Sequence, residues 1–92
     1  MENLEKVLVS RGERIVLQML EKQYHWIARD YDDCLYVYED KPRKKKNTNS
    51  WVSKYGCCEL SAFEHLFQFI QYENSEPWLI KDIINKCGVK FD

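Results

Sequence analysis

Residues 24–39, with the sequence YHWIARDYDDCLYVYE, constrain the fold of this chain more than any other stretch. Two runs rich in aromatic and β-branched side chains, 24–29 and 34–39, flank the acidic segment 30–33. Such runs are typical of β-strands, and aspartate suits a turn because its side chain bonds to nearby backbone amides. The stretch therefore predicts a β-hairpin around which the rest of the chain packs.

The register of this hairpin decides which side chains share a face. A loop of two or four residues pairs Arg29 with Cys34, whereas an odd loop moves one strand's side chains to the other face. In the even register, the predicted core face carries Tyr24, Trp26, Ala28, Leu35 and Val37. The opposite face, which includes Cys34, combines apolar bulk with hydrogen-bonding groups, as interface centres do. Either a helix or loop covers that face, or it is a partner-binding surface of His25, Ile27, Arg29, Tyr36 and Tyr38.

Helix signals lie on both sides of the hairpin. Ser10 and Glu13 match a capping box, which predicts a helix near 11–22. Its apolar residues at helical spacing, which we expect against the Trp26 face of the hairpin, are Ile15, Val16, Met19 and Leu20. Pro77 in a first turn predicts a second helix near 76–87, with Gly88 at its end.

The segment between these elements has mixed signals. Residues 51–55 have the alternation of a third strand. Ser61 and Glu64 match a second capping box that would open a short helix, and 69–72 would form a fourth strand or continue that helix. The 92 residues are enough for one core. We therefore expect one α+β domain spanning 1–92, with a three- to four-stranded antiparallel sheet centred on the 24–39 hairpin and two to three helices.

Residues 40–50 form the densest charge feature of the sequence, and Pro42 with the Asn/Thr/Ser tail predicts an exposed loop. The formal net charge of the chain is only −1, so no global field attracts polyanions. This basic loop is either solvated, or it contacts phosphates or an acidic surface, with Trp51 and Tyr55 available to stack on bases. The contact residues would be Lys41, Arg43, Lys44, Lys45, Lys46 and Trp51.

The sequence has no catalytic signature, phosphate loop or zinc-type cysteine spacing, so we expect no enzyme activity, no catalytic residues, no metal and no cofactor. The N-terminal segment lacks signal-peptide features, and no apolar run is long enough for a membrane span. These features predict a cytoplasmic protein with four free cysteines. Because a Cys57–Cys58 disulfide would be strained, at least one of the two is expected to be a small buried side chain.

Two segments of the chain, Trp26-Ile27-Ala28-Arg29-Asp30 and the pattern F-x-F-I-x-Y-E-x-x-E-P over 67–77, carry a resemblance to known sequences. Together with the capped helix, they resemble short proteins encoded by phages and prophages of Gram-positive bacteria, over most of residues 10–84. The shared motifs are structural and contain no active site.

The resemblance implies a small phage accessory protein in a bacterial host cell that binds and blocks a host protein, for example a CRISPR effector. The hairpin face and the basic loop would form its surface. The alternative is a nucleic-acid-binding accessory protein that uses residues 41–46. The two functions merge if the loop competes with nucleic acid for an effector's groove, and exposed aromatic residues on a sheet face would equally suit a homodimer.

Overall fold

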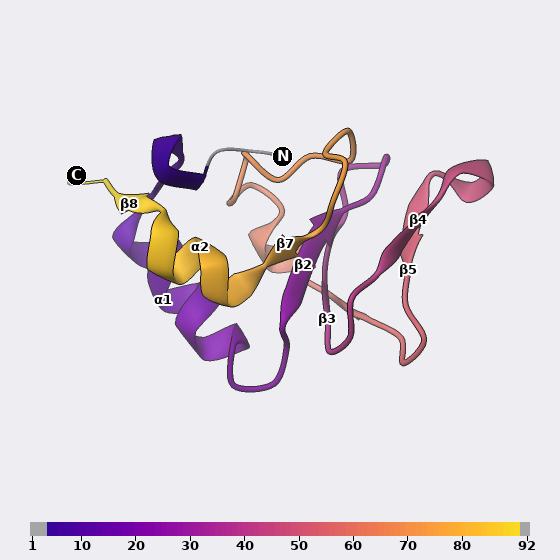
Figure 1. Ribbon diagram of the computed structural model, residues 1–92, viewed down its shortest axis with the longest axis horizontal. Helices are drawn as coiled ribbons and strands as arrows, with labels where there is room; N and C mark the ends of the chain where they lie inside the picture. The colour runs from indigo at the N-terminus through magenta and orange to yellow at the C-terminus, as the bar shows by residue number, and fades with distance from the viewer. Residues whose placement is uncertain (1–3, 91–92) are drawn as a thin grey trace.

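The computed structural model describes residues 4–90 as an α+β fold, in which two helices pack on one face of a four-stranded antiparallel sheet (Figure 1). The sheet has the order β6-β3-β2-β7. Its strands are β2 (Trp26–Arg29), β3 (Leu35–Tyr38), β6 (Cys58–Glu59) and β7 (Trp78–Leu79), and the helices are α1 (Arg11–Leu20) and α2 (Ile80–Lys86). The predicted fold class and central hairpin are therefore confirmed. Residues 1–3 and 91–92 of the predicted domain lie outside the described residues.

The predicted register of the central hairpin is wrong by one residue. Arg29 pairs with Leu35, not with Cys34, and Ile27 pairs with Val37. The reason is the loop: the Asp30 N–H donates to the Cys34 carbonyl at 2.9 Å, which leaves the three residues 31–33 between them. Asp33 closes this loop in the left-handed region at φ 71°, a conformation that aspartate tolerates better than most residues. An odd loop exchanges the two faces of one strand relative to the other.

The corrected register gives the sheet two different faces. The larger core lies on the helix side, where Ile27, Leu35 and Val37 pack with Leu17 of α1 and the α2 isoleucines. The other face is smaller and aromatic, with Ala28, Tyr38 and Trp51 at its centre and Trp26, Tyr36 and Tyr72 around them. The central hairpin of the sheet is therefore covered on both sides, which leaves no broad open face on it.

The predicted capping box of α1 is present. Ser10 Oγ accepts the Glu13 N–H at 3.0 Å, and Glu13 Oε1 accepts the Ser10 N–H at 2.8 Å. The predicted apolar stripe is partly wrong, because Leu17 is fully buried while Ile15 and Met19 are 57% and 65% exposed. Glu13 is itself buried, so the inward face of the helix begins with a carboxylate that hydrophobic periodicity does not detect.

The C-terminal helix begins later than predicted, because residues 78–79 form strand β7 and pair with β2 before α2 starts at Ile80. Gly88 does not end α2 in a left-handed turn. It belongs to β8 (Gly88–Val89), which pairs in parallel with β1 (Leu8–Val9). A Cβ atom at residue 88 would lie 2.8 Å from Leu8 Cδ2, so this close approach favours glycine. The remaining N-terminal element is the 3-10 helix η1 (Leu4–Lys6).

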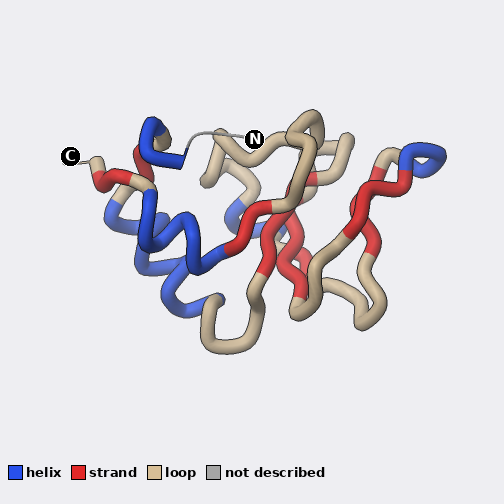
Figure 2. The backbone as a smooth tube through the Cα atoms, viewed as in Figure 1, coloured by secondary structure: helices blue, strands red, loops and turns tan. Residues whose placement is uncertain are grey.

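Residues 64–77 form a long loop without regular structure (Figure 2). The second capping box is absent: the preceding element is the 3-10 helix η3 (Ser61–Phe63), whose N-cap is Leu60, with no side-chain cap. The strand or helix predicted at 69–72 is also absent. The loop is nevertheless held firmly, because Phe67 and Ile70 are fully buried in the core.

A second hairpin extends from the body at the end opposite the helices (Figure 1). It consists of β4 (Arg43–Lys45), the 3-10 helix η2 (Lys46–Thr48) and β5 (Ser50–Val52). The principal extents of the molecule are 39 × 24 × 21 Å. None of the helices among residues 4–90 has both the length and the apolar composition needed to span a membrane.

Candidate functional site

The protruding hairpin, which we call the hairpin arm and define as residues 41–54, concentrates the positive charge of the chain. It contains six of the 14 basic residues and no acidic residue. The rest of the sequence has eight basic and 15 acidic residues, a net charge of −7. The small net charge of the whole chain therefore conceals a strong polarity, with a basic arm on an acidic body.

The structure corrects the prediction of an irregular loop at 40–50, since the basic run is itself a β-strand. Arg43 pairs with Val52, Lys44 with Trp51, and Lys45 with Ser50. Because successive side chains of a strand point to opposite faces, Arg43 and Lys45 face solvent about 7 Å apart, while Lys44 faces the body. Lysine-rich segments disfavour strands, so intrinsic propensity did not reveal β4.

The inward side of the arm fixes it to the aromatic face of the sheet. The Lys44 ammonium lies 5.0 Å from the ring centroid of Trp51 and 4.5 Å from that of Tyr72, and it donates to the Asn74 carbonyl at 2.9 Å. Trp51 is 5% exposed; its indole N–H donates to the Arg29 carbonyl and its backbone N–H to Asp30 Oδ1. Of the six predicted contact residues, these two are therefore structural, whereas Lys41, Arg43, Lys45 and Lys46 are exposed.

A cleft of about 360 Å³ lies at the root of the arm, where β4 and β5 leave the body. Its lining residues are Asp40, Lys41, Arg43, Val52, Ser53 and Lys54. Three of these carry exposed positive charges, while Asp40 is half-buried and its Oδ2 accepts the Lys54 N–H at 3.2 Å. The acidic group is therefore engaged by the fold, and the cationic groups face solvent.

The predicted partner-binding face is not assembled. Ile27, Arg29 and Tyr38 are 0%, 5% and 1% exposed, because the three-residue loop turns them into the two cores. His25 is exposed and Tyr36 is half-buried, with its hydroxyl donating to Glu59 at 3.4 Å. Replacement of Tyr36 and Tyr38 together would thus disturb the core, and would not report on partner binding alone.

Arg29 instead organises the long loop. Its Nε donates to the Ile70 carbonyl at 2.7 Å, and its two terminal nitrogens donate to the carbonyls of Asp33, Glu64, Leu66 and Phe67 at 2.9–3.2 Å. These five hydrogen bonds match the five N–H donors of a guanidinium. On the other side of the same peptide segment, the Phe67 N–H donates to buried Glu13. The buried side chains of Arg29 and Glu13 thus hold Phe67, whose φ of 56° is strained for a bulky residue.

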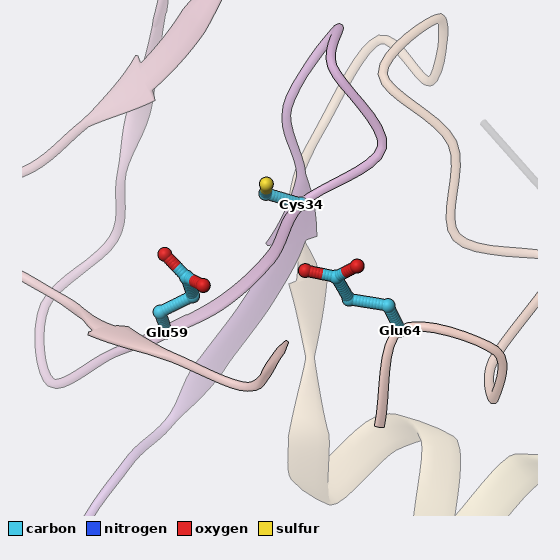
Figure 3. Close-up of side chains that lie close together, drawn as sticks. All are labelled: Cys34, Glu59 and Glu64. Carbon is cyan, nitrogen blue, oxygen red and sulfur yellow. The ribbon is translucent and has the colours of Figure 1, made fainter. Parts of the chain in front are cut away.

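Within residues 4–90, one group of side chains could hold a metal ion. The ligand atoms of Cys34, Glu59 and Glu64 lie within 4.8 Å of one another (Figure 3). Burial of the thiol, its hydrogen bond with Asp32 and the nearby carboxylates raise the pKa of Cys34 to about 11, so the thiol is protonated at neutral pH. The three residues come from different segments, so no spacing motif in the sequence predicts the group. His25 and Cys34 lie at opposite ends of the central hairpin, which does not bring them together as a nucleophile and base.

The other cysteines have different surroundings. Cys57 and Cys58 are both exposed, so the prediction that at least one is buried is wrong. They lie at the edge of the sheet, in and beside the two-residue strand β6, where little of the chain covers them. Cys87 is the buried cysteine, and burial raises the pKa of its thiol.

The chain was compared with protein-family models, with curated protein sequences and with solved structures, and no match was found in any of the three. The site is therefore interpreted from its own geometry.

Proposed function

We propose that the protein is a binding protein whose contact element is the hairpin arm and whose partner is nucleic acid. The observation that carries this proposal is the charge polarity: six positive charges lie on one protruding hairpin, and the rest of the chain has a net charge of −7. Cations that neutralise phosphates release condensed counterions, which gives salt-dependent binding without base specificity. Because the acidic body is repelled by the same polyanion, the protein would approach nucleic acid with the arm first.

The anchoring of the arm supports this function. Lys44 and Trp51 face the body, so the strand pair is fixed and its outward cations need little further ordering upon binding. Arg43, Lys45 and Lys46 have no role in the cores and are free to contact a ligand. A cytoplasmic location, where nucleic acid is abundant, is part of this proposal.

A second candidate function is inhibition of a host protein by a phage-type accessory protein, possible targets being nucleic-acid-binding effectors such as those of CRISPR systems. It is supported by the resemblance of the sequence to short phage proteins and by the two apolar side chains Ile15 and Met19. These lie one turn apart on α1 and are more than half exposed, so both are accessible to a partner. A homodimer through the same face is consistent with this candidate.

The two candidates are separated by purification of the tagged protein from bacterial host lysate, with and without nuclease, followed by analysis of the bound nucleic acid and protein. If nucleic acid is the partner, it co-purifies with the wild type and is lost upon nuclease treatment. It is also reduced for the arm variant Lys45→Gln/Lys46→Gln but not for the body variant Lys22→Gln/Lys81→Gln. A protein that survives nuclease and binds the purified chain would favour the inhibitor, and recovery of neither would contradict both.

A further inference from the structure

The root of the hairpin arm has features that go beyond a diffuse basic surface. The cleft of about 360 Å³ has two walls: one carries Lys41 and Arg43, and the other carries Ser53 and Lys54. The walls come from segments about ten residues apart, so three cations that are separated in sequence converge on one hollow. Convergence of charges in a cleft raises the local potential more than the same charges do on a flat surface.

The neighbours of these cations engage them only weakly. Lys41 lies 3.5 Å from Glu76, but both side chains are more than half exposed, and such pairs contribute only about 0–1 kcal/mol. The Lys41 ammonium also lies 5.5 Å from the ring centroid of Trp26, a contact that contributes about 0.5–1 kcal/mol at an exposed site. The carboxylate of Asp40 accepts the Lys54 backbone N–H through Oδ2, and its Oδ1 is buried without a hydrogen-bond partner among the described residues. The acidic group therefore belongs to the wall of the cleft, and the three cationic residues that line it are exposed to solvent.

An exposed aromatic ring lies next to this cleft. Tyr55 is 68% exposed, and the Lys54 ammonium lies 5.5 Å from its ring centroid. Both residues are held in a tight turn, in which Ser53 Oγ donates to the Gly56 carbonyl at 2.7 Å and Gly56 adopts φ 85°. The position needs glycine, because side chains disfavour this region of backbone space. The turn thus presents a large ring to solvent without packing it against the core.

We infer that the cleft binds the phosphate backbone of single-stranded nucleic acid, with Lys41, Arg43 and Lys54 contacting phosphates and Tyr55 stacking on a neighbouring base. This inference rests on the proposed function and narrows it to one site and one form of nucleic acid. A cationic groove beside an aromatic ring is the combination that single-strand binding requires, because unpaired bases expose their faces for stacking. A duplex or an acidic protein offers charges but no free base, so it would leave Tyr55 without a role.

The test is fluorescence anisotropy of the full chain with a labelled 20-nucleotide oligothymidine and with a 20-base-pair duplex, at several salt concentrations. The cleft variant is Lys41→Gln/Arg43→Gln/Lys54→Gln. Its matched control, with the same change in net charge at exposed positions on the body, is Lys22→Gln/Lys81→Gln/Lys90→Gln. A third variant, Lys45→Gln/Lys46→Gln, removes cations from the outer arm. Tyr55→Ala and Tyr55→Phe test stacking, and circular dichroism checks that each variant is folded.

We expect the wild type to bind the single strand more tightly than the duplex. Loss of three phosphate contacts should reduce the slope of log affinity against log salt by about two, while the matched control keeps the wild-type slope. Tyr55→Ala should lower single-strand affinity about tenfold with an unchanged slope, because stacking is independent of salt, and Tyr55→Phe should bind like the wild type.

The contrary outcomes are distinct. If the cleft variant binds as the wild type does while the outer-arm variant loses affinity, the cleft inference is overturned but the arm remains the contact element. Equal affinity for the duplex, together with no effect of Tyr55→Ala, would overturn the single-strand assignment. If the wild type binds neither oligonucleotide at low salt, the proposed function itself fails.

Discussion

Replacement of Arg29 by methionine keeps an unbranched apolar stem in the core but removes the guanidinium that donates to five backbone carbonyls. Hydrogen bonds to a charged group contribute about 1.5–3 kcal/mol each, so five give an upper bound of about 7–15 kcal/mol. The true cost is smaller, since the desolvation penalty of the guanidinium is recovered and water reaches parts of the exposed loop. We expect a loss of about 4 kcal/mol, as when one member of a buried charged network is removed.

This loss is large relative to the stability of a small domain, which is typically about 5–15 kcal/mol. With a urea dependence of about 1.5 kcal/mol per molar, the unfolding midpoint should fall by roughly 2.5 M. Equilibrium urea unfolding followed by tryptophan fluorescence measures this shift, and Trp51, which donates to the Arg29 carbonyl, reports from beside the site.

Arg14→Met is the matched control, because the Arg14 side chain donates one hydrogen bond within the described part of the chain, to the Ile84 carbonyl at 2.6 Å. It should cost only about 1–2 kcal/mol, in line with one charged hydrogen bond. Arg29→Lys, which keeps the charge but offers three donors, should fall between the two. If Arg29→Met and Arg14→Met have equal midpoints, the carbonyl contacts of Arg29 are not what stabilises the long loop.

Two further substitutions test local features of the central hairpin. Tyr38→Phe should raise the free energy of unfolding by about 1 kcal/mol, since the Tyr38 hydroxyl is buried with no hydrogen-bond partner among the described residues. Because burial raises the pKa of Tyr38 above its ordinary value of 10.0, the folded state keeps the proton while the unfolded state loses it. Wild-type stability should therefore fall as the pH rises above 10, and less so in Tyr38→Phe, as measured by urea unfolding at pH 8 and 10.5. Asp33→Gly should stabilise the fold by about 0.5 kcal/mol by relieving the positive φ, and a lower thermal midpoint would contradict this account.

The sequence predicts the elements whose signals are local. The Ser10–Glu13 capping box and the two aromatic runs of the hairpin needed only neighbouring residues, and both are present. The register did not follow, because it depends on whether Asp33 adopts a left-handed conformation, and two, three or four loop residues fit the same sequence. The conformation of Asp33 therefore determines which face of the sheet each side chain of the hairpin joins. It is also the reason why the predicted binding surface is not assembled.

Other features depended on contacts between distant residues. Glu13 is predicted from the sequence as a capping residue, but its second oxygen accepts the buried Phe67 N–H, a contact that the sequence does not predict. The segment 64–77 was predicted to contain a short helix and a strand or further helix, yet four of its carbonyls accept hydrogen bonds from Arg29, a strand residue about 40 positions earlier. On the hairpin arm, the sequence predicts a dense group of exposed cations. The inward orientation of Lys44 could not be predicted, because it depends on the pairing of Lys44 with Trp51.

The pairing of β1 with β8 has a consequence for the order in which the chain assembles and opens. It joins residue 8 to residue 88, so the intervening chain of about 80 residues must be ordered before two short strands can meet. Each strand has only two residues, and Leu8, Gly88 and Val89 are at least partly exposed while Val9 is buried in the core, which places this pair among the late contacts to form and the early ones to separate. Cys87 lies directly beside the pair and is buried, whereas Cys57 and Cys58 are exposed. The rate of Cys87 alkylation would therefore report how often the β1–β8 pair opens. The alkylation rates of the two exposed thiols would give the reference value for an unprotected cysteine.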